Sequence, residues 1–362
     1  MKPTPVTPSI STDLFRSLLD AEYLSPAMLV YAARKDHRRL PTLLLSVMEQ
    51  EGAELGTGAR DELRRAHERD RDYQDLYRAI AEDAECRVLK GPRLAERYPA
   101  GLRRAVGDLD LVVPDEKALW SGLRRALRER EVSRILLALH GEEGRELTVE
   151  IHWPSEDDLL DGDASAEFNT APLPGNFGTV RPRTSLPDDD WVASLLGLAE
   201  ERFQRSFEVR DILDVHVLAA SAPPVDTVVE AIRGYGREPE VLELLTRAND
   251  SLGTGTLTDL AEALVEPAEA EEARRASAAH GIATDPDETD VDRRFKAGLP
   301  VQGFMLRRAD DRRTLTEARR HAFSRGWLLL TPVGDYLLCG GPVVAQDDYE
   351  AALRELECLG EI

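Results

Sequence analysis

One short segment, residues 106–114 with the sequence VGDLDLVVP, constrains this chain more than any other. Residues i and i+2 of a β-strand project from the same face. The pattern therefore predicts a strand that places Asp108 and Asp110 on one face, with Leu109 and Leu111 entering the core from the other. Two neighbouring carboxylates repel each other unless a cation compensates them. Magnesium prefers such oxygen ligands and leaves coordination positions open for substrate phosphates, so the pair is interpreted as a metal site.

Length and composition predict a soluble, globular protein of more than one domain. The chain has 362 residues, 42% of them hydrophobic, which is enough to build substantial cores. No apolar signal segment follows Met1, and no uncharged apolar run is long enough to span a bilayer. The three cysteines are widely spaced, which argues against a disulfide framework or a zinc site. We therefore expect a cytoplasmic protein without a membrane partner.

The formal net charge of −22 argues against nucleic acid as a partner, because it repels polyanions. The segment 93–104 carries four arginines, but it is short. A small phosphorylated ligand that arrives with magnesium faces no such obstacle. The charge balance thus favours a nucleotide over a nucleic acid.

The order of the patterns predicts a mixed α+β fold with helical N-terminal and middle regions. Residues 1–10 read as a disordered lead, and residues 11–83 as a helical region in which Ser11 can cap the first helix. A small mixed sheet with flanking helices is expected over residues 84–160. A loop plus a helical region follows over residues 161–279, with Gly, Pro, Asn and Asp concentrated in 161–186.

A separate, small α/β module is expected at residues 291–362, after an acidic linker at 284–290. Its strands are predicted near 301–307, 327–330 and 336–339. Between the first two, the sequence TLTE at 314–317 resembles a capping box, which predicts a helix ending at Gly326. Two roles fit this module: recognition of an acceptor, or formation of a homo-oligomer.

A further candidate site residue, Glu150, lies on a later predicted strand. Residues 145–153 alternate cleanly, so Glu150 and His152 share a polar face opposite the apolar one. That face can adjoin the aspartates and makes Glu150 a third candidate metal ligand. His152 is interpreted as a structural hydrogen-bonding residue, because magnesium prefers oxygen. Asp211 and Asp214 are expected to pair with arginines such as Arg205 or Arg210.

Taken in order, these motifs resemble the nucleotidyltransferase superfamily, and most closely its uncharacterised bacterial family with an N-terminal helical region. The similarity covers about residues 10–220. The segments that carry it are Val88–Gly91, Leu94–Tyr98, Arg103 or Arg104 ahead of Gly107–Val113, Val149–Trp153 and Arg210–Asp214.

The resemblance implies a nucleotidyltransferase-type sheet and transfer of a nucleoside monophosphate, with AMP from ATP as the favoured case. The acceptor would be a hydroxyl, amine or similar group on a small molecule, peptide or protein, and pyrophosphate would leave. Two magnesium ions would be held by Asp108, Asp110 and Glu150. Glu150 would also help to remove the acceptor's proton.

The same resemblance assigns the phosphates to Lys90, Gly91, Arg103 and Arg104. Glycine lets the backbone approach a phosphate closely, and the cations neutralise its charge. The superfamily usually has Gly-Ser or Gly-Gly at this turn, whereas this chain has Gly91-Pro92, which removes one amide donor. The helix after Asp188 also has Ala199-Glu200-Glu201 where a histidine is expected.

These departures keep two other functions open. The first is a catalytically silent, nucleotidyltransferase-like binding or regulatory protein. The second, weaker one is a phosphotransferase that moves the terminal phosphate and releases ADP.

Overall fold

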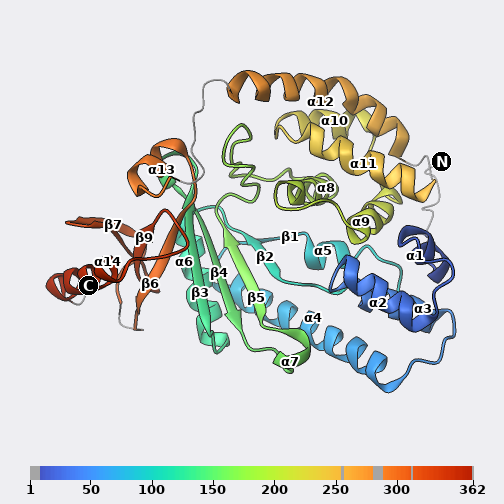
Figure 1. Cartoon of the computed structure of the whole chain (residues 1–362), viewed down its shortest axis with the longest axis horizontal. Coiled ribbons are helices and arrows are strands. Elements are labelled where there is room, and N and C mark those ends of the chain that lie inside the picture. Colours follow the sequence, from blue (N-terminus) through green and yellow to red (C-terminus); the bar gives the residue numbers. More distant parts are fainter. Residues whose placement is uncertain (1–8, 254–256, 280–287, 311–312, 361–362) are drawn as a thin grey trace. The chain divides into compact units, whose positions relative to one another are not determined.

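The computed structural model describes residues 9–253, 257–279, 288–310 and 313–360 (Figure 1). The expected disordered lead at 1–10 and the acidic linker at 284–290 therefore lie largely outside the described residues. The helices are α1 (Thr12–Leu18), α2 (Pro26–Asp36), α3 (Leu40–Gln50), α4 (Thr57–Asp83), α5 (Gly91–Ala95), α6 (Glu116–Glu129), α7 (Asp158–Asp161), α8 (Asp190–Glu200), α9 (Val209–Ala219), α10 (Val225–Arg233), α11 (Glu238–Leu252), α12 (Thr258–Ala279), α13 (Val291–Ala297) and α14 (Gln346–Leu359). The strands are β1 (Arg87–Leu89), β2 (Leu109–Val112), β3 (Arg134–His140), β4 (Glu146–Trp153), β5 (Ala164–Asn169), β6 (Val301–Arg308), β7 (Arg319–Phe323), β8 (Gly326–Leu330) and β9 (Gly334–Cys339).

The expected α+β class is confirmed, and the chain forms two compact units. The first unit combines Met1–Asp72, Leu89–Gly107 and Leu186–Ser277. The second combines Tyr73–Val88, Asp108–Ser185 and Ala278–Ile362. Each unit is thus assembled from three separate stretches, so helices and strands that are far apart in sequence share a core.

The first unit is helical, and its described N-terminal part has a core of its own. Ser11 caps α1 as expected, since its Oγ accepts a hydrogen bond from the Leu14 N–H at 3.2 Å. Apolar side chains from α1, α2, α3 and α9 form one buried cluster, which includes Phe15, Leu29, Leu44 and Leu213. The helix α9 therefore packs with helices that precede it by more than 150 residues.

A nine-stranded mixed sheet has the order β1-β2-β5-β4-β3-β6-β9-β8-β7. Strand β2 pairs with β5 in parallel, whereas the β5–β4, β4–β3 and β3–β6 pairs are antiparallel. The strands expected around 86–90, 134–140 and 145–153 are present as β1, β3 and β4. Strand β5 was not expected, because it lies in the segment that reads as loop.

One face of the central strands is apolar and covered by helices. Phe168 of β5 is fully buried, and Gly122 of α6 lies so close to it that an added Cβ would be 3.2 Å from its ring. The same Cβ would be 3.1 Å from Ile80 of α4. Tyr73 of α4 also makes an edge-on contact with Trp153 of β4, at 5.9 Å between ring centroids. The polar residues of these strands therefore project from the opposite face.

The C-terminal segment joins this sheet through β6, which pairs with β3 in the register Leu137 with Gly303. Arg124 of α6 adds a second link, since its Nη2 donates to the carbonyl oxygens of Arg313 (2.8 Å) and Leu315 (3.1 Å). The described residues of 291–362 thus extend the sheet of the second unit through β6, β9, β8 and β7.

The helix expected from residue 314 to Gly326 is wrong, because the chain there forms the antiparallel hairpin β7–β8. Phe323 pairs with Gly326 at its turn, where the glycine has φ 148°. Leu328 and Leu330 of β8 are buried in a cluster with Leu337 of β9 and residues of α14. Burial of these leucines in the sheet outweighs the local capping signal of the sequence TLTE.

None of the described helices is long and apolar enough to cross a membrane.

We predict that Gly303→Val destabilises the second unit at the β3–β6 junction. A Cβ at this position would lie 2.9 Å from Leu137 Cδ2 and 3.2 Å from the Tyr336 ring, and overpacking of this kind costs about 1–3 kcal/mol. Urea denaturation would show a lower midpoint. Gly341→Val is the control, since the nearest atom to its Cβ is 3.8 Å away; equal losses in both variants would contradict the prediction.

Candidate active site

Three carboxylates form a row across neighbouring strands of the second unit. Asp110 of β2 is the register partner of Glu167 of β5, and Glu167 is the register partner of Glu150 of β4. Side chains at directly paired positions project from the same face, and neighbouring strands lie about 4.8 Å apart. The carboxylate row, defined as Asp110, Glu167 and Glu150, therefore lies on the face opposite Phe168.

Asp108 lies immediately before β2 and is exposed, whereas Asp110 is half-buried. The residues between and after them behave as the alternation predicts, because Leu109 and Leu111 are both 0% exposed. The core thus fixes the orientation of β2, and Asp110 is held toward Glu167.

Glu150 has a basic neighbour on its own strand. Its Oε1 lies 3.1 Å from His152 Nε2, and the Glu150 side chain is 31% exposed. This contact agrees with the interpretation of His152 as a hydrogen-bonding residue. It also gives Glu150 a group with which to share a proton.

Glu167 is a further candidate site residue that the sequence pattern did not reveal. Its Oε1 accepts a hydrogen bond from Asn169 Nδ2 at 2.6 Å, and Asn169 Oδ1 in turn accepts one from the Thr148 hydroxyl at 2.7 Å. His140 Nε2 lies 3.1 Å from that hydroxyl, and burial lowers the pKa of His140 to about 4. The ring is thus neutral at pH 7. The available signal was the alternation ASAEF at 164–168, which the surrounding Gly and Asp residues obscured.

The donor set of the carboxylate row is suitable for a hard divalent cation, since it consists only of carboxylate oxygens on one face. Among the described residues, however, no group of three or more His, Cys, Asp or Glu side chains is arranged to hold a metal ion. The carboxylate row therefore supplies suitable donor atoms but is not a preformed metal site.

The predicted phosphate turn belongs to the first unit. Lys90 precedes α5 with φ 55° and ψ −124°, a conformation that residues other than glycine rarely adopt. Such a backbone costs on the order of 1–3 kcal/mol and persists where the surroundings impose it. Lys90 Nζ lies 2.6 Å from Glu201 Oε1, and Gly91 is buried beside it. The lysine that was expected to meet phosphate is thus held in a fixed place.

Arg104 is buried and supports this turn through a hydrogen bond to the backbone of Gly91. Its Nε and Nη2 donate to the two carboxylate oxygens of Asp214 at 2.6 and 2.7 Å, and its Nη1 donates to the Gly91 carbonyl at 3.2 Å. Tyr98 donates its hydroxyl hydrogen to Asp214 at 2.7 Å. Arg205 pairs with Asp211 as expected, but the partner of Asp214 is Arg104, which had been assigned to phosphate.

Arg103 is more accessible than Arg104. Its backbone N–H donates to Ser46 Oγ at 2.9 Å, and its Nη1 lies 3.1 Å from His67 Nδ1. The backbone is thereby anchored to α3. The two neighbouring arginines differ in environment, because only Arg104 is enclosed with a carboxylate.

A family model described as an uncharacterised nucleotidyltransferase matches residues 30–253, which is more than half of the chain. The chain belongs to this family. No curated protein and no solved structure gives a significant match.

Membership of this nucleotidyltransferase family identifies the protein as a transferase enzyme and its reaction class as nucleotidyl transfer. The matched residues 30–253 include the carboxylate row, Asp108 and the turn at Lys90 and Gly91. Nucleotidyltransferases generally use a nucleoside triphosphate with a divalent metal. The expected family is thereby confirmed.

We predict that Arg104→Ala destabilises the nucleotidyltransferase by about 3–5 kcal/mol, because it leaves the Asp214 carboxylate buried without its cation. The two side chains are 5% and 0% exposed. Thermal unfolding measures the loss. Arg97→Ala is the control, since that arginine makes an exposed contact with Ser221; a stable Arg104→Ala protein would show that the pair is not structural.

We predict that Asp70→Asn stabilises the enzyme at pH 7–8 but not at pH 4. Burial raises the pKa of Asp70 to about 6, despite the hydrogen bond from the Val106 N–H. A raised pKa in the folded state favours folding below the unfolded value near 3.8, and that advantage is lost as the pH rises through 6. Asparagine keeps an acceptor for Val106 and removes the charge, so we expect a gain of about 1–3 kcal/mol at neutral pH.

Urea denaturation at several pH values tests this. Asp75→Asn on the same helix, where the carboxylate is 55% exposed, should show no such gain. A pH-independent effect of Asp70→Asn would refute the explanation.

Proposed function

We propose that the enzyme transfers a nucleoside monophosphate, in the favoured case AMP from ATP, to a hydroxyl, amine or similar acceptor on a small molecule, peptide or protein. Pyrophosphate is the other product. The observation that carries the proposal is the carboxylate row, together with the family match over the same residues. Three acids on one sheet face are unfavourable without a cation.

Magnesium fits this donor set, and we assign it to Asp108, Asp110 and Glu150, with Glu167 as an additional ligand from the strand between them. When bound, magnesium neutralises phosphate charge and aligns the reacting groups, and two ions are expected. Glu167 enters the proposal because it is the direct register partner of both Asp110 and Glu150.

The remaining roles fall to side chains around the turn and to Glu150. Lys90 and Arg103 neutralise phosphate charge, and Gly91 lets the backbone approach the phosphates. We assign Arg104 only an indirect part in phosphate binding: it holds the Gly91 carbonyl, since its guanidinium is buried and paired with Asp214. Glu150 accepts the acceptor's proton and shares it with His152 at 3.1 Å.

We predict that Asp110→Asn, Glu150→Gln and Glu167→Gln each reduce nucleotidyl transfer by at least about 100-fold, because each removes a charge that holds the metal. The assay incubates the protein with each labelled nucleoside triphosphate, magnesium and a cell extract, and detects added nucleotide mass by mass spectrometry. Glu131→Gln is the control, since Glu131 is an exposed acid of the same unit. Full activity of Asp110→Asn would refute the proposal.

Stability provides a readout of the same variants that does not depend on knowing the acceptor. In metal-free buffer Glu167→Gln should be more stable than wild type by about 0.2–1 kcal/mol, because like charges at paired strand positions repel. Glutamine keeps the acceptor for Asn169 Nδ2. Magnesium should raise the melting temperature of wild type and not of Asp110→Asn.

The two alternatives predict different outcomes of the same assay. Release of ADP instead of pyrophosphate would identify a phosphotransferase. Triphosphate binding without any product, across all nucleotides and extracts, would identify a silent binding protein. Gly91-Pro92 favours the silent binding protein, because proline removes an amide donor from the turn.

A further inference from the structure

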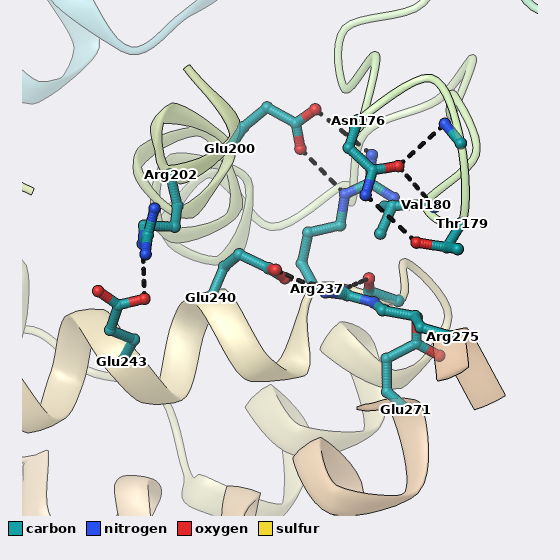
Figure 2. A network of polar contacts seen from close by, with 12 residues as sticks. Asn176, Thr179, Val180, Glu200, Arg202, Arg237, Glu240, Glu243, Glu271 and Arg275 are labelled. Atoms are coloured by element: carbon teal, nitrogen blue, oxygen red, sulfur yellow. Dashed lines mark hydrogen bonds and ion pairs between the residues drawn. The ribbon is translucent and has the colours of Figure 1, made fainter. Parts of the chain in front are cut away.

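Two consecutive acids, Glu200 and Glu201, stand at the C-terminal end of α8. The helix dipole disfavours negative charge at this end, so each acid depends on a cation from elsewhere in the first unit. Figure 2 shows Glu200 with Arg237, whose Nε lies 2.9 Å from Glu200 Oε2, and both side chains are buried. Two residues after Glu200, Arg202 pairs with Glu243 of α11 at 2.7 Å. The buried Glu200–Arg237 pair fixes the chain immediately before Glu201, whereas the Arg202–Glu243 pair is exposed to solvent.

Glu201 itself is directed to the phosphate turn. Its Oε1 lies 2.6 Å from Lys90 Nζ, and the two side chains are only 21% and 19% exposed. Its Oε2 lies 3.5 Å from Arg205 Nε. Burial raises the pKa of Glu201, but the charges of Lys90 and Arg205 outweigh this and leave the pKa below its usual value. Glu201 therefore keeps a cationic neighbour even when Lys90 also contacts a ligand.

The aliphatic part of the Lys90 side chain is also positioned, by its passage close to Gly197 of α8. A Cβ at Gly197 of α8 would lie 3.0 Å from Lys90 Cγ and 3.3 Å from Lys90 Cε. The helix thus lacks a side chain where the lysine passes. With the positive φ of Lys90, three independent features determine where this ammonium group lies.

We propose that Glu201 is a positioning residue that, with the gap at Gly197, holds Lys90 ready for a triphosphate. The inference rests on the proposed function, in which Lys90 binds phosphate. An ammonium group has three donors, so Lys90 can keep its contact with Glu201 while it donates to a phosphate oxygen. Preorganisation of this kind lowers the entropic cost of binding.

Calorimetry with ATP and magnesium tests the inference on the full chain. Lys90→Met, which keeps the stem and removes the charge, should weaken ATP binding by at least about tenfold. Glu201→Ala should cost about the same factor, and adding it to Lys90→Met should cost nothing more, because it acts through the lysine. Glu201→Gln, which keeps an oxygen acceptor for Lys90, should stay within about threefold of wild type.

Gly197→Ala separates positioning from stability. Alanine favours the helix over glycine, so the melting temperature should not fall, yet ATP binding should weaken because the lysine stem is displaced. Arg202→Ala is the control, since the Arg202–Glu243 pair is 41% and 39% exposed and should leave ATP binding unchanged.

A second measurement follows Lys90 directly. An amine-reactive acylating reagent, read out by mass spectrometry, should modify Lys90 several times faster in Glu201→Ala than in wild type. ATP with magnesium should slow the reaction in both proteins.

These experiments distinguish failure of the positioning role of Glu201 from failure of the proposed function. If Glu201→Ala costs the same factor in the Lys90→Met background as in wild type, or leaves both ATP affinity and the labelling rate unchanged, the positioning role is refuted and the proposed function stands. If folded wild-type protein binds no nucleoside triphosphate with magnesium, the proposed function fails, and the inference fails with it.

Discussion

The pairing of β5 with β2 and β4 is the constraint on which the second unit depends. This register places Glu167 directly between Asp110 and Glu150 and buries Phe168 against the opposite helices. A shift of β5 by one residue would move Glu167 into the apolar face and Phe168 out of it. The hydrophobic core therefore holds three like charges close together. A divalent cation would offset the repulsion between them.

In the first unit, acidic residues hold the cationic side chains of two arginines and one lysine in place. Arg104 meets Asp214, Arg237 meets Glu200, and Lys90 meets Glu201. The first two pairs are fully enclosed and shape the scaffold, because a buried charge that loses its partner is strongly unfavourable. The third retains access to solvent and involves a strained backbone at Lys90. That difference in burial and backbone conformation is the basis on which we propose a ligand-binding role for Lys90 and a structural role for the two enclosed arginines.

Much of the fold could be predicted from local patterns. The alternation at 145–153 identified β4, the pattern around Asp108 identified β2, and Ser11 was correctly placed as a cap. The pattern failed at 314–326, where a local capping signal competed with burial of Leu328 and Leu330. It also failed at β5, because a six-residue strand that begins with Ala-Ser-Ala, within a Gly- and Asp-rich segment, has little intrinsic signal. The partner of Asp214 was unpredictable, since the 110 residues that separate it from Arg104 carry no information about their contact.

The sequence by itself determined the family, the acidic strand, and the candidates Asp108, Asp110, Glu150, Lys90 and Gly91. Alternation within a strand and the order of motifs are both visible in the sequence, because neither depends on contacts between distant segments. Only the tertiary structure decided that Glu167 lies between Asp110 and Glu150. It also decided that Arg104 pairs with Asp214 and that Glu201 pairs with Lys90. These are contacts between distant segments, and burial of separate apolar faces in a shared core brings such segments together.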